Sequence, residues 1–101
     1  MSSPELHLKL SPRARQDFVD ILRYTAETWG QAQLLLYRDL IDTALQTLRL
    51  NPDIGHRHDD LPLTHHVYLV GSHVIVYRSN ASDISVVRIP HQRMSLARHG
   101  S

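Results

Sequence analysis

The chain has 101 residues, 11 lysines and arginines against 10 aspartates and glutamates, and a formal net charge of +1. It contains no cysteine, which excludes disulfides and thiolate metal sites. The small charge is far from that of a dedicated nucleic-acid-binding domain, and no apolar run approaches the roughly 20 residues of a membrane-spanning helix. The first residues lack the features of a signal peptide, so we expect a cytoplasmic protein with one domain over residues 1–101.

A short strand and a helix are predicted first. Leucine alternates with a polar residue over residues 6–10, which is the period of a strand with one buried face. A serine–proline pair follows and marks a helix start, because the hydroxyl can cap a free amide and proline suits the first turn. Apolar residues spaced by three and four predict a helix over Pro12–Trp29, with Phe18 and Trp29 in its buried stripe and Gly30 ending it.

A second helix is predicted over Gln31–Leu50, where apolar residues again recur at three and four. Asn51 and Pro52 end this helix, because a residue that precedes proline is pushed out of the helical conformation. Only a glycine and its neighbours separate the two helices, so they are expected to form an antiparallel hairpin. The consecutive leucines 34–36 cover more than one helix face, which leaves part of this apolar surface for a partner.

The remaining residues predict a loop and three strands. Residues 52–62 are polar and rich in turn formers, which is typical of a loop. The strands are predicted at His65–Val70, His73–Arg78 and Asp83–Ile89. Turns at 71–72 and 79–82 connect them so closely that they must form an antiparallel meander. The predicted fold class is α+β in the order β-α-α-β-β-β, with the helices on one face of the sheet.

Four short motifs are spread along the chain. They are Trp29-Gly30 at the helix turn, Asn51-Pro52 before the loop, Tyr77-Arg78 on the middle strand of the meander, and Arg88, His91 and Arg93 at its end. Together with the order of the elements, they resemble the ParE branch of the RelE/ParE toxins of bacterial toxin–antitoxin pairs, over roughly residues 6 to 96. Two positions depart from the family pattern, because Ser95 replaces a usual aspartate and Pro90 a usual leucine or valine.

The resemblance implies a toxin that inhibits DNA gyrase by protein–protein contact, arrests growth and supports plasmid stability. It also implies a cognate antitoxin, ParD-like or another small DNA-binding protein, through which the toxin reaches operator DNA only indirectly. The surface expected to recognise the target consists of Arg88, His91, Arg93, Met94 and Arg98. Guanidinium groups suit bidentate contacts to carboxylate or phosphate, and methionine is an adaptable apolar contact. Proline cannot donate a ladder hydrogen bond, so we expect the last strand to stop at Pro90 and expose the residues that follow.

Two alternatives remain open at this point. Related RelE toxins cut messenger RNA on the ribosome, and here His91, Arg93, Arg78 and Tyr77 would supply the base, the acid and the cations for such cleavage. Strand alternation places Tyr77 and Arg78 on opposite faces, and the only lysine, Lys9, is remote in sequence, which counts against a complete catalytic set. The other alternative is a non-toxic family member that only forms the antitoxin complex.

The antitoxin is expected to dock on amphipathic and apolar side chains of the helices and the sheet. The residues proposed for this surface are Leu34, Leu35, Tyr37, Tyr24 and Tyr68. Helix-in-groove binding and strand addition are both available to a segment that folds as it binds.

Structural roles are the alternative for several of these residues. Arg78 and Arg88 could each pair with a nearby acid such as Asp83. The histidine-rich stretch between residues 56 and 66 has ligand-type side chains, but zinc needs three or four that converge. His65 and His66 point to opposite faces of a strand, so we expect no metal site and no cofactor.

Overall fold

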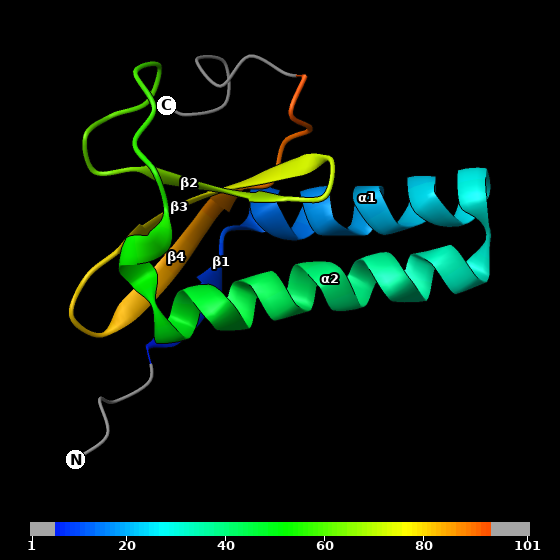
Figure 1. Ribbon diagram of the computed structural model, residues 1–101, viewed down its shortest axis with the longest axis horizontal. Coiled ribbons are helices and arrows are strands. Elements are labelled where there is room, and N and C mark those ends of the chain that lie inside the picture. The colour runs from blue at the N-terminus through cyan, green and yellow to red at the C-terminus, as the bar shows by residue number, and fades with distance from the viewer. Residues whose placement is uncertain (1–5, 94–101) are drawn as a thin grey trace.

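The computed structural model describes residues 6–93, and its elements follow the predicted order (Figure 1). They are β1 His7–Leu10, α1 Pro12–Trp29, α2 Gln31–Leu50, the 3-10 helix η1 Pro52–Ile54, β2 His66–Val70, β3 His73–Ser79 and β4 Asp83–Arg88. Both predicted helices are confirmed, and the strand ends differ from the prediction by one residue. Residues close in sequence determine where each helix begins and ends, which explains this agreement. The Ser11 hydroxyl, for example, accepts the Ala14 N–H at 2.9 Å and caps α1.

The four strands form a mixed sheet in the order β1-β4-β3-β2. The predicted antiparallel meander of β2, β3 and β4 is confirmed, and the α+β class with it. β1 joins the sheet at the outer edge of β4 and runs parallel to it. The Ser11 hydroxyl donates to the Val87 carbonyl at 2.7 Å, which fixes the start of α1 to this edge. The parallel pairing also brings Lys9, remote in sequence, into register with Ser85 of β4.

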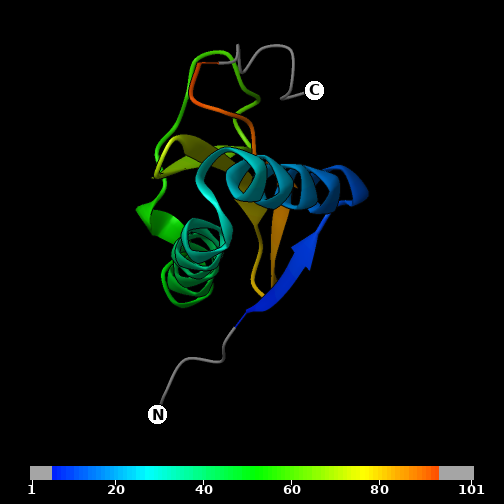
Figure 2. The same ribbon diagram turned by 90° about the vertical axis from the view of Figure 1, so that its right-hand side faces the viewer.

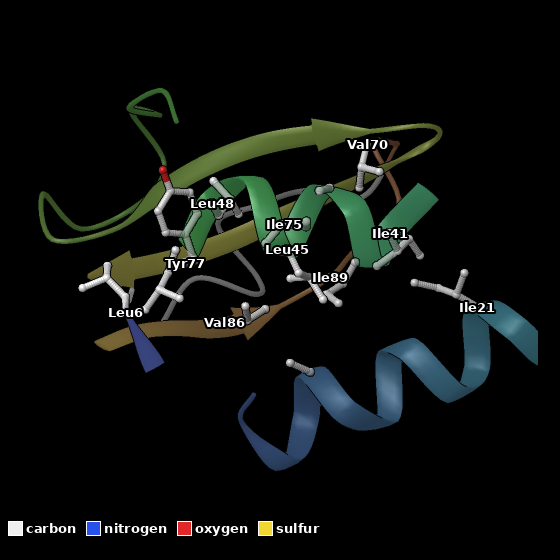
Figure 3. Packing of buried hydrophobic residues seen from close by; sticks show 13 residues of the cluster. Leu6, Ile21, Ile41, Leu45, Leu48, Val70, Ile75, Tyr77, Val86 and Ile89 are labelled. Atoms are coloured by element: carbon white, nitrogen blue, oxygen red, sulfur yellow. The ribbon is translucent and has the colours of Figure 1, made fainter. Parts of the chain in front are cut away.

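The helices pack on one face of the sheet and enclose the main core (Figure 3). This cluster takes side chains from both helices and from β2, β3 and β4, and the leucines of β1 pack against it. Its largest fully buried members are Tyr77, Ile41, Leu45, Leu48, Ile75, Ile84, Ile89 and Val86. A smaller cluster of Leu61, Val67, Val74 and Val76 lies on the opposite face of the sheet. β3 is therefore buried on both faces, which is why its sequence is a continuous apolar run rather than an alternating one.

The prediction that Trp29 belongs to the core is wrong, because its side chain is 69% exposed. Trp29 is the last residue of α1, and the hairpin of α1 and α2 projects beyond the strands, so no sheet lies beneath it (Figures 1 and 2). Phe18, nearer the sheet, is partly buried against the core as expected. Helical spacing identified the correct stripe but carries no information about where the sheet ends.

The prediction that the chain leaves the sheet at Pro90 is also wrong. The Val74 N–H donates to the Pro90 carbonyl at 2.9 Å, and the Gln92 N–H donates to the Ser72 carbonyl at 2.9 Å. An isolated bridge pairs His73 with His91 between these two bonds. Proline lacks a donor but keeps its carbonyl acceptor, so the segment stays beside β3 after β4 has formally ended.

Tyr77 is fully buried and ties η1 to the sheet. Its hydroxyl donates to the Pro52 carbonyl at 2.7 Å and accepts the Gly55 N–H at 3.0 Å. A Cβ at Gly55 would lie only 2.2 Å from this hydroxyl, so the contact requires glycine. Burial raises the pKa of Tyr77 above its ordinary value, and the Gly55 N–H partly opposes that shift.

We expect Tyr77→Phe to lower the free energy of unfolding by about 1–2 kcal/mol, because both backbone partners lose their hydrogen bond in a buried place. Urea denaturation followed by circular dichroism measures this loss. Tyr68→Phe is the matched control, since the Tyr68 hydroxyl has no hydrogen-bond partner among residues 6–93. Equal stability of the two variants would show that the Tyr77 hydroxyl does not hold η1.

Candidate recognition site

A hollow of about 460 Å³ lies between α1 and the end of β4. It is lined by Arg13, Asp17, Asp20, Ile21, Tyr24, His73, Arg88, Ile89, Pro90 and His91. Two of the residues predicted for target recognition, Arg88 and His91, therefore lie in its wall. The hollow combines both signs of charge with the apolar side chains of α1, so it is suited to binding protein side chains rather than a single ion.

Arg88 is held in this wall by Asp17 of α1. Its Nε lies 2.8 Å from the Asp17 carboxylate, and a second nitrogen lies 3.3 Å away. The same carboxylate accepts the Ile89 N–H at 2.9 Å. The two side chains are only 13% and 11% exposed. Arg88 thus fixes the end of β4 against α1. Asp83, the acid suggested from the sequence, pairs with Lys9 at 3.4 Å instead.

Tyr37, His73 and His91 form a small cluster beside the hollow. The Tyr37 hydroxyl lies 2.6 Å from His73 Nδ1 and accepts the Ser72 N–H at 3.0 Å. The His91 ring meets the His73 ring edge-on, with centroids 5.2 Å apart. Tyr37 was predicted to face an antitoxin; in the structure it is partly buried and its hydroxyl holds the turn between β2 and β3.

The turn itself depends on glycine at position 71. Gly71 has a φ of +56°, in the left-handed region, and a Cβ there would lie 2.6 Å from the Tyr37 hydroxyl oxygen. Any larger residue would therefore both strain the backbone and displace Tyr37. Gly71 therefore lets Tyr37 keep its contacts to Ser72 and His73.

The His73 pKa is lowered, first by burial and then by the neighbouring His91, while Asp17 opposes the shift. The unfolded chain takes up this proton at about the ordinary value of 6.5, so below that pH it binds more protons than the folded chain. Stability from His73 is therefore fully present above pH 6.5 and is lost as pH falls through the lower folded pKa. Tyr37, His91, Asp17 and the Arg88 guanidinium are the polar groups that surround the ring.

We expect His73→Gln to flatten the rise in stability between about pH 5 and 7, because the substituted side chain does not titrate. Urea midpoints measured across this range compare the slopes of the variant and the parent chain. Some slope should remain, since burial and Arg78 also lower the pKa of His65. An unchanged slope in the variant would contradict the assignment to His73.

Arg93 is the one further predicted recognition residue within residues 6–93, and it follows His91 at the same end of the sheet. Arg93 is exposed, and its N–H donates to His91 Nδ1 at 3.1 Å. His91 itself is half-buried. Met94 and Arg98 lie outside the described residues. His91 and Arg93 are therefore adjacent at the rim of the hollow, with Arg88 buried behind them.

The four residues predicted for nuclease activity are not all brought together, although His91 and Arg93 are adjacent. Tyr77 is completely buried on the helix side of the sheet, with its hydroxyl engaged by backbone. Arg78 is exposed on the opposite face, since Val74 and Val76 of the same parity form the smaller cluster. His91 belongs to the helix side, where it contacts His73.

The helical hairpin carries a second candidate surface. Of the residues predicted for antitoxin binding, Tyr24 and Leu35 are exposed, while Leu34 and Tyr68 are partly buried. Sequence reasoning missed a longer feature on α2, which we call the outer stripe: Leu36, Leu40, Thr43, Thr47 and Leu50. Its three leucines are 64%, 46% and 63% exposed. The five residues of the stripe are spaced by three and four, which could have revealed it as a second stripe beside the buried one.

Residues 6–93 hold neither a cluster of metal ligands nor a membrane-spanning helix. No three histidine, aspartate or glutamate side chains in this part of the chain are placed to hold a metal ion. Neither described helix is long and apolar enough to cross a membrane.

Several known proteins resemble this chain in sequence and in fold. Residues 8–96 match the family model described as the ParE toxin of the type II toxin–antitoxin system parDE. Toxin ParE1 of Caulobacter vibrioides is 29% identical over 91 residues, covering 90% of this chain and 94% of that protein. Toxin ParE1 of Mycobacterium tuberculosis is 33% identical over 91 residues, with coverage of 89% and 93%. A solved chain from the chromosomal ParDE system of P. aeruginosa aligns with a TM-score of 0.73 over 86% of this chain and 96% of that one; at 16% identity it shows the fold alone.

Proposed function

Because the chain belongs to the ParE family of toxins from type II toxin–antitoxin systems, we propose that it inhibits DNA gyrase by protein–protein contact and that a cognate antitoxin neutralises it. Blocked gyrase would arrest growth in the cytoplasm, and a plasmid that encodes the pair would be retained. The toxin would reach operator DNA only through its antitoxin.

The observation that carries the contact mechanism is the separation of Tyr77 from Arg78 by the thickness of the sheet. A nuclease needs its base, acid and cations within hydrogen-bond reach of one phosphate. Arg88, another cation near the strand end, is engaged by Asp17. Inhibition by contact needs only a rigid recognition surface, and the wall held by Arg88 and Asp17 supports one.

The target surface that we propose is the rim formed by His91 and Arg93 with the hollow beside α1. Arg93 offers an exposed guanidinium for a carboxylate or phosphate on the target. The adjoining hollow supplies apolar contact from Ile21 and Tyr24. Met94 and Arg98 continue the chain from this rim.

The antitoxin surface that we propose is the outer stripe of α2 together with Tyr24 and Leu35. Isolated exposed leucines are ordinary, but a row of them along one helix is the pattern that an amphipathic partner helix covers. The proposed target and antitoxin surfaces share Tyr24 and otherwise lie on different elements, so an antitoxin bound on the outer stripe would also compete with the target at Tyr24.

Expression of the chain in bacteria without its antitoxin tests the proposal. We expect growth arrest, relaxed plasmids and intact translated messages. Arg93→Ala is expected to relieve the arrest, whereas Arg38→Ala, an exposed arginine of α2, is the matched control and should not. Cleaved messages with supercoiled plasmids would instead identify a RelE-type nuclease, and normal growth would identify a non-toxic member that only forms the complex.

A further inference from the structure

A second hollow, of about 480 Å³, opens on the sheet face that is turned away from the helices. The leucines of β1 pack into the helical core, so Lys9 between them points to this other face. Ser85 alternates in the same way with the buried Ile84 and Val86 of β4. Arg78 lies on this face as well, and all three residues line the hollow.

These side chains form a row across three strands. Lys9 of β1 is in register with Ser85 of β4, and Arg78 of β3 is in register with Ser85 from the other side. Directly cross-strand residues have Cβ atoms only about 4.5–5.5 Å apart. His65, just before β2, extends the row and lines the same hollow. We call Lys9, Ser85, Arg78 and His65 the cationic row.

The charges of the cationic row are not balanced within the hollow. No aspartate or glutamate lines it in the part of the chain that is described. Lys9 pairs with Asp83 outside the hollow, but its side chain stays 63% exposed. Arg78 has neither an ion pair nor a hydrogen bond to any residue between 6 and 93, and its charge helps to lower the His65 pKa after burial has done so. Two cations and a hydroxyl on neighbouring strands are an arrangement that favours an anion.

The surroundings of the row decide which anion fits. Pro62 and Val87 also line it, so the hollow has apolar side chains beside the cationic row. No tyrosine, phenylalanine or tryptophan lines it among the described residues, so the only aromatic ring for a base is that of His65, whereas single-stranded nucleic acids bind such grooves by stacking successive bases. A peptide segment that presents carboxylates among apolar side chains matches both features.

We propose that the cationic row binds the carboxylates of an acidic, leucine-rich peptide segment of another protein. Arg78 supplies the planar donor for one carboxylate, and Lys9 and Ser85 supply donors for the same group or its neighbour. This interaction uses a face that neither the rim at His91 nor the outer stripe of α2 occupies. It therefore does not depend on gyrase being the target.

Fluorescence anisotropy with the purified full chain tests this binding. The probe is a short labelled peptide of glutamate and leucine, and its counterpart has lysine at every glutamate position. We expect only the acidic peptide to bind, and we expect its affinity to fall between about 50 and 200 mM salt because the contact is partly solvated. Arg78→Ala should weaken binding about fivefold.

Two controls make the outcome decisive. Arg38→Ala removes an exposed arginine from a different surface and should leave the affinity unchanged. Lys9→Ala is a second variant within the row and should weaken binding as Arg78→Ala does. Equal binding by parent and Arg78→Ala, or no binding of the acidic peptide, would overturn the proposal. A thymidine oligonucleotide that binds more tightly than the peptide and depends on Arg78 would overturn it as well, in favour of phosphate.

Discussion

Asp17→Ala is expected to lower the free energy of unfolding by about 3 kcal/mol, because it removes one partner of an ion pair whose side chains are only 11% and 13% exposed. The Arg88 guanidinium loses both of its contacts to the carboxylate, and the Ile89 N–H loses its acceptor. Since domains of this size have a total stability of only about 5–15 kcal/mol, the loss is a large fraction of it. Urea denaturation of the purified variant measures the change.

Two further variants separate the charge from the hydrogen bonds. Asp17→Asn keeps an oxygen acceptor and should lose less stability than Asp17→Ala. Asp20→Ala removes an exposed aspartate from the same helix, and we expect it to cost less than about 0.5 kcal/mol. If Asp17→Ala and Asp20→Ala lowered the free energy of unfolding equally little, the ion pair with Arg88 would not be what holds the end of β4 against α1.

The second large effect concerns the antitoxin. The double variant Leu36→Ala, Leu40→Ala is expected to bind the antitoxin of the same operon about 100-fold more weakly, because central apolar anchors of an interface contribute about 1–2 kcal/mol each. Both side chains are exposed in the free chain, so the stability of the toxin itself should hardly change. Isothermal titration calorimetry with purified antitoxin measures the affinity.

Leu63→Ala is the matched control for this variant. Leu63 is 74% exposed and lies outside the helical hairpin, before β2. Its removal therefore lowers the surface hydrophobicity without changing the outer stripe. Its affinity for the antitoxin should equal that of the parent chain. The outer stripe is not the antitoxin surface if the double variant also binds like the parent.

The sequence predicted the helices well because their signals are local. Ser11 caps α1, Gly30 separates the helices and Asn51-Pro52 ends α2, each through its own backbone preferences. The short turns of the meander are local signals too. The parallel pairing of β1 with β4 is not, because nothing near Lys9 in the sequence specifies which strand it will meet. The cationic row follows from that pairing and could not be predicted.

The sequence predicted Arg88, His91 and Arg93 of the candidate recognition site, but neither the rest of its lining nor its arrangement. His91 and Arg93 were correctly placed together, since they are close in the chain. The partner of Arg88 was not found, because Asp17 is 71 residues away and only the packing of α1 on β4 brings it near. Pro90 was interpreted as a strand end because its missing N–H is visible in the sequence, whereas the geometry of its carbonyl is not.

A supercoiling assay with purified DNA gyrase and relaxed plasmid tests the central proposal most directly. We predict that the purified chain at about micromolar concentration inhibits supercoiling, that Arg93→Ala inhibits less than Arg38→Ala, and that prior mixing with the antitoxin restores activity. Undiminished supercoiling by gyrase, with the folded chain present in large excess and no antitoxin added, would contradict inhibition by protein contact.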